Sequence, residues 1–122
     1  MKDNSIGDSE YKLMELIWDH APISSGELSD ICAELHGWKK TTVYTMIKRL
    51  SDKGFVASNK AKITYLVRRE EVQHQQSSEV VEKTFKGSLP SFVSAFLGNG
   101  KKNLSKDDAA KLIEMIENHT ED

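Results

Sequence analysis

Apolar residues recur at helical spacing along the first half of the chain. Between residues 8 and 20 they form a broad face, which predicts a helix at the centre of a small core. A second helix is predicted to begin at Ser24, which can cap it with Glu27 three residues later, and to end at His36 and Gly37. The residues of its apolar stripe, which we expect to be buried, are Leu28, Ile31, Cys32 and Leu35.

A third helix is predicted over residues 39–53, where Val43, Met46, Ile47 and Leu50 recur at i, i+3, i+4 and i+7. The other face of this helix carries hydroxyls, one aromatic ring and two cations, namely Thr41, Thr42, Tyr44, Thr45, Lys48 and Arg49. A solvated helix face usually mixes charges of both signs, so this face is typical of a surface that binds a polyanion. Taken alone, the stretch also fits a surface helix that happens to be basic.

A change of pattern follows Gly54. Two β-prone runs, Phe55–Ser58 and Ile63–Val67, flank the turn Asn59–Lys62 and predict a hairpin with a basic tip. Three helices followed by a hairpin is the order of a winged helix-turn-helix domain, in which the hairpin is the wing. Lys60 and Lys62 are then placed to contact phosphate or the minor groove, although a basic turn on any exposed hairpin would look the same.

The chain beyond residue 69 is predicted to be helical. Residues 68–76 are polar and are either the start of a longer helix or a linker, while Ser88 and Ser105 can cap two further helices. Short helices cannot bury the apolar residues of this part, so we expect a homodimer, with docking onto the first domain as the alternative. The residues expected at the dimer interface are Phe85, Leu89, Phe92, Val93, Phe96, Leu97, Leu112, Ile113 and Ile116.

The expected fold is therefore mainly α with a small β-hairpin. Residues 1–69 form an N-terminal winged-helix DNA-binding domain, and residues 70–122 form a C-terminal helical dimerisation region. Charge supports this division. Residues 38–69 hold nine bases and one acid, a net charge of +8, whereas the whole chain carries −2. A basic block between acidic flanks is typical of a phosphate-binding surface in a chain that stays soluble.

Several classes of protein are disfavoured by the sequence. No run of about 18 apolar residues is present and the first residues lack the apolar core of a signal peptide, so a cytoplasmic protein without a membrane span is expected. The single cysteine, Cys32, cannot form an internal disulfide and is interpreted as a small core residue. The four histidines are dispersed, and no catalytic cluster, phosphate loop or metal-ligand spacing appears, so we expect no enzyme, no cofactor and no metal.

Four segments together resemble the penicillinase-repressor family, which includes BlaI and MecI and has the copper-responsive CopY repressors as relatives. The segments are Glu10–Trp18, Ser24–Leu28, Thr41–Leu50 and Lys53–Val56, and the match is close over residues 6–69. The resemblance implies a homodimeric winged-helix repressor that binds a short inverted-repeat operator of double-stranded DNA, with the C-terminal helices joining the subunits.

The resemblance also implies roles for individual residues. Those expected to read bases are Thr41, Thr42, Tyr44 and Thr45. Those expected to contact phosphate are Lys39, Lys40, Lys48, Arg49, Lys60 and Lys62.

The chain departs from the family pattern at three points. Gly7 stands where relatives often have a capping Thr or Ser, which Gly replaces at little cost. In the β-lactam branch a sensor protease relieves repression at an Asn-Phe bond, and Ala95 and Phe96 occupy that position here, so they are the candidate cleavage site. The C-terminal region has no cysteine, which excludes a copper-thiolate switch.

Two functions remain open at this point. The first is a sequence-specific transcriptional repressor. The alternative is a winged-helix module that binds an acidic protein partner through residues 38–69 without recognising a DNA sequence. A stable dimer and a footprint on a palindrome would distinguish the repressor from the protein-binding module.

Overall fold

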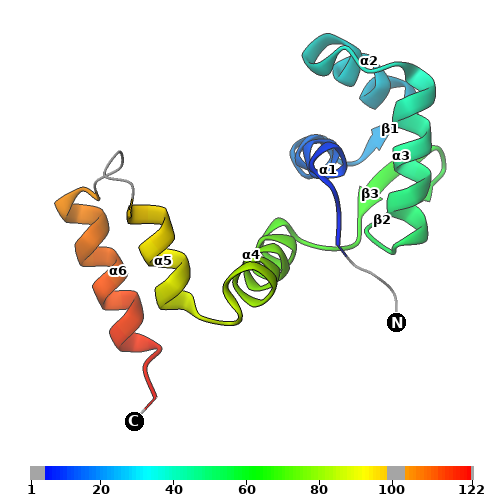
Figure 1. Cartoon of the computed structure of the whole chain (residues 1–122). Coiled ribbons are helices and arrows are strands. Elements are labelled where there is room, and N and C mark those ends of the chain that lie inside the picture. The colour runs from blue at the N-terminus through cyan, green and yellow to red at the C-terminus, as the bar shows by residue number, and fades with distance from the viewer. Residues whose placement is uncertain (1–4, 99–103, 122) are drawn as a thin grey trace. The chain divides into compact units, whose positions relative to one another are not determined.

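The computed structural model describes residues 5–98 and 104–121. It is mainly helical with one small antiparallel sheet (Figure 1). In chain order the elements are α1 (Asp8–His20), β1 (Ile23–Ser24), α2 (Ser25–His36), α3 (Lys40–Asp52), β2 (Val56–Asn59), β3 (Lys62–Tyr65), α4 (Arg69–Phe85), α5 (Leu89–Leu97) and α6 (Lys106–Asn118). The chain divides into two compact units, residues 1–78 and 79–122, and α4 contributes to both.

Local capping signals account for the limits of α2. Ser24 Oγ accepts a hydrogen bond from the backbone N–H of Glu27 at 3.2 Å, and Gly37 ends the helix with a left-handed φ of 68°. Glycine adopts this φ without the steric cost that a β-carbon would bring. The carboxylate of Glu27, which the sequence suggested would reach back to Ser24, lies instead 3.8 Å from Lys62 Nζ.

The sheet has three strands in the order β1-β3-β2, so the predicted hairpin gains a partner. Strand β1 was not predicted, because two residues are too short to show an alternating pattern. It is defined by its pairing, in which Ile23 lies opposite Ile63. At the tip of the hairpin Lys60 and Ala61 have φ values of 51° and 63°, as expected for a tight two-residue turn.

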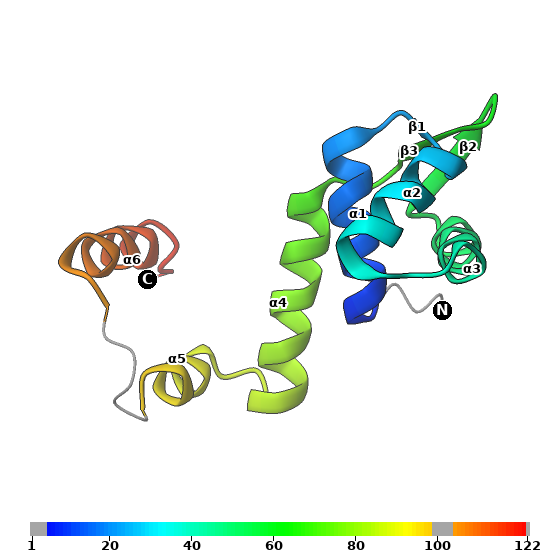
Figure 2. The same ribbon diagram turned by 90° about the horizontal axis from the view of Figure 1, so that it is seen from above.

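One apolar core holds unit 1 together, and α1, α2, α3 and the sheet all contribute to it. Figure 1 shows α3 alongside β2 and β3, and Figure 2 shows α2 next to α1. The fully buried side chains of this core are Leu13, Met14, Ile17, Leu28, Cys32, Val43, Leu50 and Ile63. Burial raises the pKa of the Cys32 thiol, which therefore stays protonated, and the prediction of a small core residue is confirmed.

The expected burial of Leu35 is wrong. This side chain is 61% exposed, whereas Leu28 on the same helix is 0% exposed. The core covers only the first two turns of α2, since every residue from Ala33 to Gly37 is exposed. The helix is longer than the surface on which it packs, and the periodicity of its sequence cannot show where that surface ends.

Helix α4 starts after a three-residue connection from the end of β3, and its first residue is held on α1. Arg69 Nη2 donates hydrogen bonds to Glu15 Oε2 at 3.1 Å and to Asp19 Oδ1 at 2.8 Å. The guanidinium also lies 5.3 Å from the centre of the Trp18 ring, whose Nε1 donates to the carbonyl of Val67 at 2.9 Å. The polar stretch after residue 68 is therefore the first part of a helix and not a linker.

Unit 2 consists of the end of α4 together with α5 and α6. Ser88 Oγ and Ser105 Oγ cap the last two helices, accepting from the N–H groups of Ser91 at 3.1 Å and Asp108 at 3.0 Å. Among the described residues of this unit none is buried, and large apolar side chains remain exposed on α5 and α6. Within residues 5–98 and 104–121, no helix is long and apolar enough to cross a membrane.

The different burial of the two leucines of α2 can be tested by truncation. We expect Leu28→Ala to lower the free energy of unfolding by about 2–5 kcal/mol, because it removes buried methyl groups and leaves a cavity. Leu35→Ala should change it by about 0.5 kcal/mol or less, because that side chain is in water. Urea denaturation of both variants makes the comparison, and equal losses would contradict the observed burial.

Candidate nucleic-acid interface

The orientation of α3 is set by its apolar stripe. Val43 and Leu50 are 0% exposed and Met46 is 5% exposed, so these three side chains face the core as predicted. Ile47, which belongs to the same stripe, is half-buried at the edge of the core. This packing turns the opposite face of the helix outward.

The outward face carries the residues that the sequence marked as candidate DNA contacts. Those that the structure leaves exposed on α3 are Lys40, Thr41, Thr42, Tyr44, Thr45, Lys48 and Arg49, and Lys39 is exposed at the N-cap. Lys40 Nζ lies 5.6 Å from the centre of the Tyr44 ring, so a cation and an aromatic ring adjoin near the N-terminal end of the helix. The structure thus brings these candidates together on one surface.

The wing adds two cations in different surroundings. Lys60 and Lys62 are both exposed, the first in the turn and the second at the start of β3. Lys62 Nζ lies 3.8 Å from Oε1 of the Glu27 carboxylate. Among the described residues, no carboxylate lies within 4.0 Å of Lys60 Nζ. The turn lysine is therefore the wing cation whose field is least offset by a neighbouring acid.

Two cations of the basic block serve the fold. Lys53 Nζ donates to both oxygens of the Glu10 carboxylate at 3.2 Å and to the carbonyl of Ser5 at 3.0 Å. Arg69 is held by the acids of α1 as described above. The net charge of residues 38–69 consequently overstates the charge that is available to an external ligand.

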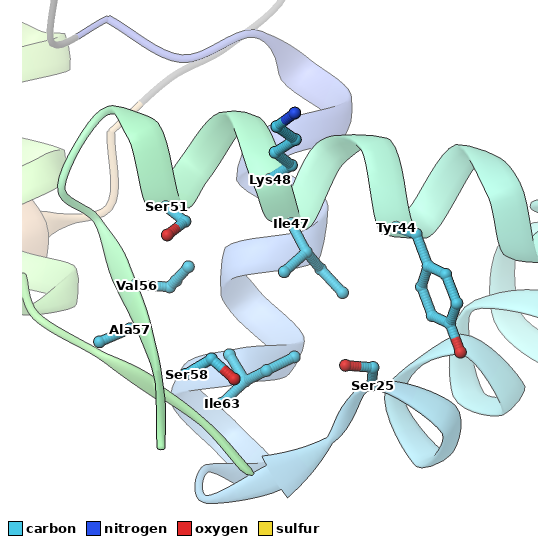
Figure 3. Close-up of a pocket in the computed structure, with 9 residues that line it drawn as sticks. All are labelled: Ser25, Tyr44, Ile47, Lys48, Ser51, Val56, Ala57, Ser58 and Ile63. Carbon is cyan, nitrogen blue, oxygen red and sulfur yellow. The ribbon is translucent and has the colours of Figure 1, made fainter. Parts of the chain in front are cut away.

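A pocket of about 260 Å³ lies between α3, the sheet and the start of α2. Figure 3 shows Ile47 directed into this space and Lys48 directed away from the strands. Ser25, Ser51 and Ser58 place hydroxyls around a mainly apolar lining, to which Tyr44 and Lys48 also belong. Sequence reasoning missed these serines, because they come from α2, α3 and β2, and the sequence does not show which elements will pack side by side.

A second pocket, of about 250 Å³, lies along the first three turns of α3. Its lining residues are Thr41, Thr42, Thr45, Met46 and Arg49. Thr45 Oγ1 donates a hydrogen bond to the backbone carbonyl of Thr41 at 2.9 Å. Three of the four predicted base readers therefore line one shallow pocket, which we call the threonine pocket.

The expected dimerisation residues all lie in unit 2. Phe92, Val93, Phe96, Leu97, Leu104 and Leu112 line an entirely apolar pocket of about 210 Å³. The rings of Phe85 and Phe92 meet edge to face with their centroids 5.4 Å apart. Leu89, Ile113 and Ile116 are more than half exposed. In the part of the chain that the structure describes, no group of three His, Cys, Asp or Glu side chains could hold a metal ion.

Comparison with known proteins shows relatives along nearly the whole chain. The Methicillin resistance regulatory protein MecI of Staphylococcus aureus is 27% identical over 119 residues, which cover 94% of this chain and 95% of MecI. The Penicillinase repressor of Bacillus licheniformis is 26% identical over 118 residues, which cover 93% of this chain and 91% of the repressor.

Two solved structures resemble the N-terminal part of the chain. One is the solution structure of the DNA-binding domain of the repressor BlaI, with a TM-score of 0.53 and 28% identity. The other is monomeric Bacillus licheniformis BlaI in complex with the blaP half-operator, with a TM-score of 0.50 and 26% identity. Each match covers 58% of this chain and 93% of the other, and the winged-helix fold is thereby confirmed. Because residues 6–118 also match the family model described as Penicillinase repressor, the chain belongs to the penicillinase repressor family.

Proposed function

We propose that this protein is a sequence-specific DNA-binding repressor that inserts α3 into the major groove. The observation that carries the proposal is the outward face of α3, where hydroxyls, an aromatic ring and cations gather opposite the buried stripe. In helix-turn-helix proteins the second helix of the motif reads base edges with its N-terminal residues. The BlaI structure in complex with its half-operator supports the same use of the related fold.

The exposed residues divide into two roles. Thr41, Thr42, Tyr44 and Thr45 occupy the N-terminal half of α3 and are proposed to face the bases. The cations proposed to contact phosphate are Lys39, Lys40, Lys48, Arg49, Lys60 and Lys62. Phosphate contacts fix the register of a protein on DNA but carry no sequence information directly, so specificity falls to the first group.

The proposed assembly is a homodimer on an inverted-repeat operator. Residues 1–69 bind DNA, and residues 70–122 join the subunits. The exposed apolar side chains of α5 and α6 support this division, since none of the described residues of unit 2 is buried within one chain. Two α3 helices in such a dimer would enter major grooves about one helical turn, roughly 34–36 Å, apart.

Relief of repression is proposed to occur by proteolysis between Ala95 and Phe96. Both residues are exposed near the end of α5, a helix of nine residues. A short helix with few buried contacts opens locally at little cost, which a protease requires to reach the backbone. A sensor protease is the proposed partner for this step, and the cytoplasm, where the DNA is found, is the proposed location. We assign the protein no catalytic activity of its own.

The division of roles on α3 can be tested with single substitutions. Lys48→Ala and Arg49→Ala should weaken binding to operator and to scrambled DNA alike. Each should also reduce the magnitude of the slope of log K against log salt concentration by about one, because one phosphate contact is lost. Thr42→Ala and Tyr44→Ala should instead reduce the ratio of operator to scrambled affinity. Gel shifts at several salt concentrations on both probes provide the measurement, with DNA footprinted upstream of the protein's own gene as the operator.

The matched control is Lys83→Ala, which removes an exposed cation from α4 outside the proposed interface. It should leave both affinities unchanged. Equal losses on both probes for all four α3 variants would refute the division. Binding of an acidic protein by residues 38–69, without a footprint on any DNA, would favour the protein-binding module instead.

The dimer can be tested by placing a charge in the apolar pocket of unit 2. Leu112→Glu should convert a dimer to a monomer in sedimentation, because the burial of a carboxylate in an apolar interface is costly. The neighbouring Lys111→Glu is the control and should remain dimeric. Retention of helical circular dichroism in both variants excludes simple unfolding, and a wild-type monomer would refute the assembly.

A further inference from the structure

The threonine pocket offers a ligand fewer hydrogen-bond donors than its composition suggests. Threonine has a single hydroxyl proton. In Thr45 this proton is donated to the carbonyl of Thr41, four residues earlier on the same helix. Such a bond to the helix backbone is a common state of helical threonine. Towards DNA, Thr45 therefore presents a methyl group and a hydroxyl oxygen that can accept but not donate.

The remaining lining of the pocket is of mixed polarity. Each threonine brings a methyl group, and Met46 contributes what little of its side chain reaches the surface, since it is 5% exposed. Arg49 is the one charged residue of the lining. The pocket is thus a shallow surface that places threonine methyl groups beside hydroxyls and one guanidinium.

The major groove presents one apolar group, the C5-methyl of thymine, and threonine methyls are among its usual contacts. We propose that the threonine pocket binds the C5-methyl group of one thymine in each half of the operator and so selects that base. The inference rests on the proposed function and adds the base and the chemical group that are read. It also assigns Thr45 a contact through its methyl group and not through its hydroxyl.

The methyl group of the DNA can be removed without any other change. In the footprinted operator each thymine is replaced in turn by deoxyuridine, which keeps all hydrogen-bonding groups. We expect one position per half-site at which this replacement weakens wild-type binding by about fourfold, as the loss of one buried methyl-sized apolar contact predicts. At the other thymines affinity should stay the same.

Two substitutions of Thr45 separate its methyl from its hydroxyl. Thr45→Val keeps a methyl and removes the hydroxyl, so it should retain the preference for thymine over deoxyuridine at the sensitive position. Thr45→Ser keeps the hydroxyl and removes the methyl, so it should bring the ratio of the affinities for the thymine and deoxyuridine operators close to one. Thr84→Ser, an exposed change on α4, is the control and should leave the preference as in the wild type.

The outcomes distinguish this inference from the function on which it rests. Specific operator binding with no deoxyuridine-sensitive position would overturn the methyl pocket and leave the repressor intact. Loss of the preference in Thr45→Val with retention in Thr45→Ser would show that the hydroxyl is the reader, which also overturns it. Absence of binding to any DNA would refute the proposed function and the inference together. Thermal unfolding of each variant confirms that the fold is unchanged.

Discussion

The burial of three side chains on one face of α3 determines what the protein can present to a ligand. Complete burial of an aliphatic side chain is worth about 1.5–3 kcal/mol, and Val43, Met46 and Leu50 are all buried. A rotation of the helix by one residue, about 100°, would move this stripe out of the core. Exposed polar groups gain little from any one orientation, so the core sets the rotation. The outward face of threonines and cations follows from that choice.

The basic block serves two purposes, and the structure separates them. Lys53 forms an ion pair with Glu10, and Arg69 forms ion pairs with Glu15 and Asp19. These pairs hold α3 and α4 on α1. These pairs are partly exposed, so their value lies more in fixing geometry than in stability. The cations of α3 and the turn lysine of the wing remain for a ligand. A count of charges along the sequence cannot make this distinction, because it depends on pairs about 40 to 55 residues apart.

Much of the fold was predictable because its signals are local. Ser24, Ser88 and Ser105 begin helices at the predicted positions, and the stripe of α3 identified its exposed face from sequence alone. The misses share a physical cause, which is dependence on a distant partner. Strand β1 exists through its pairing with β3, and the exposure of Leu35 depends on where the core ends. The hydrogen bond from the Thr45 hydroxyl to the carbonyl of Thr41 was missed for a different reason, since the sequence does not show which rotamer a threonine adopts.

The side chains proposed to face the bases are three threonines and one tyrosine, and they discriminate weakly between sequences, since bidentate base contacts come mainly from arginine, lysine, asparagine or glutamine side chains. A single methyl contact is worth a factor of about four. When two linked copies bind one operator, these factors multiply, and the same contact then contributes a factor of about sixteen. The proposed pairing through the apolar faces of α5 and α6 therefore does more than bury exposed side chains. In such a dimer the small preference of each α3 would become a large one, so its specificity would depend on the residues of unit 2 that join the subunits.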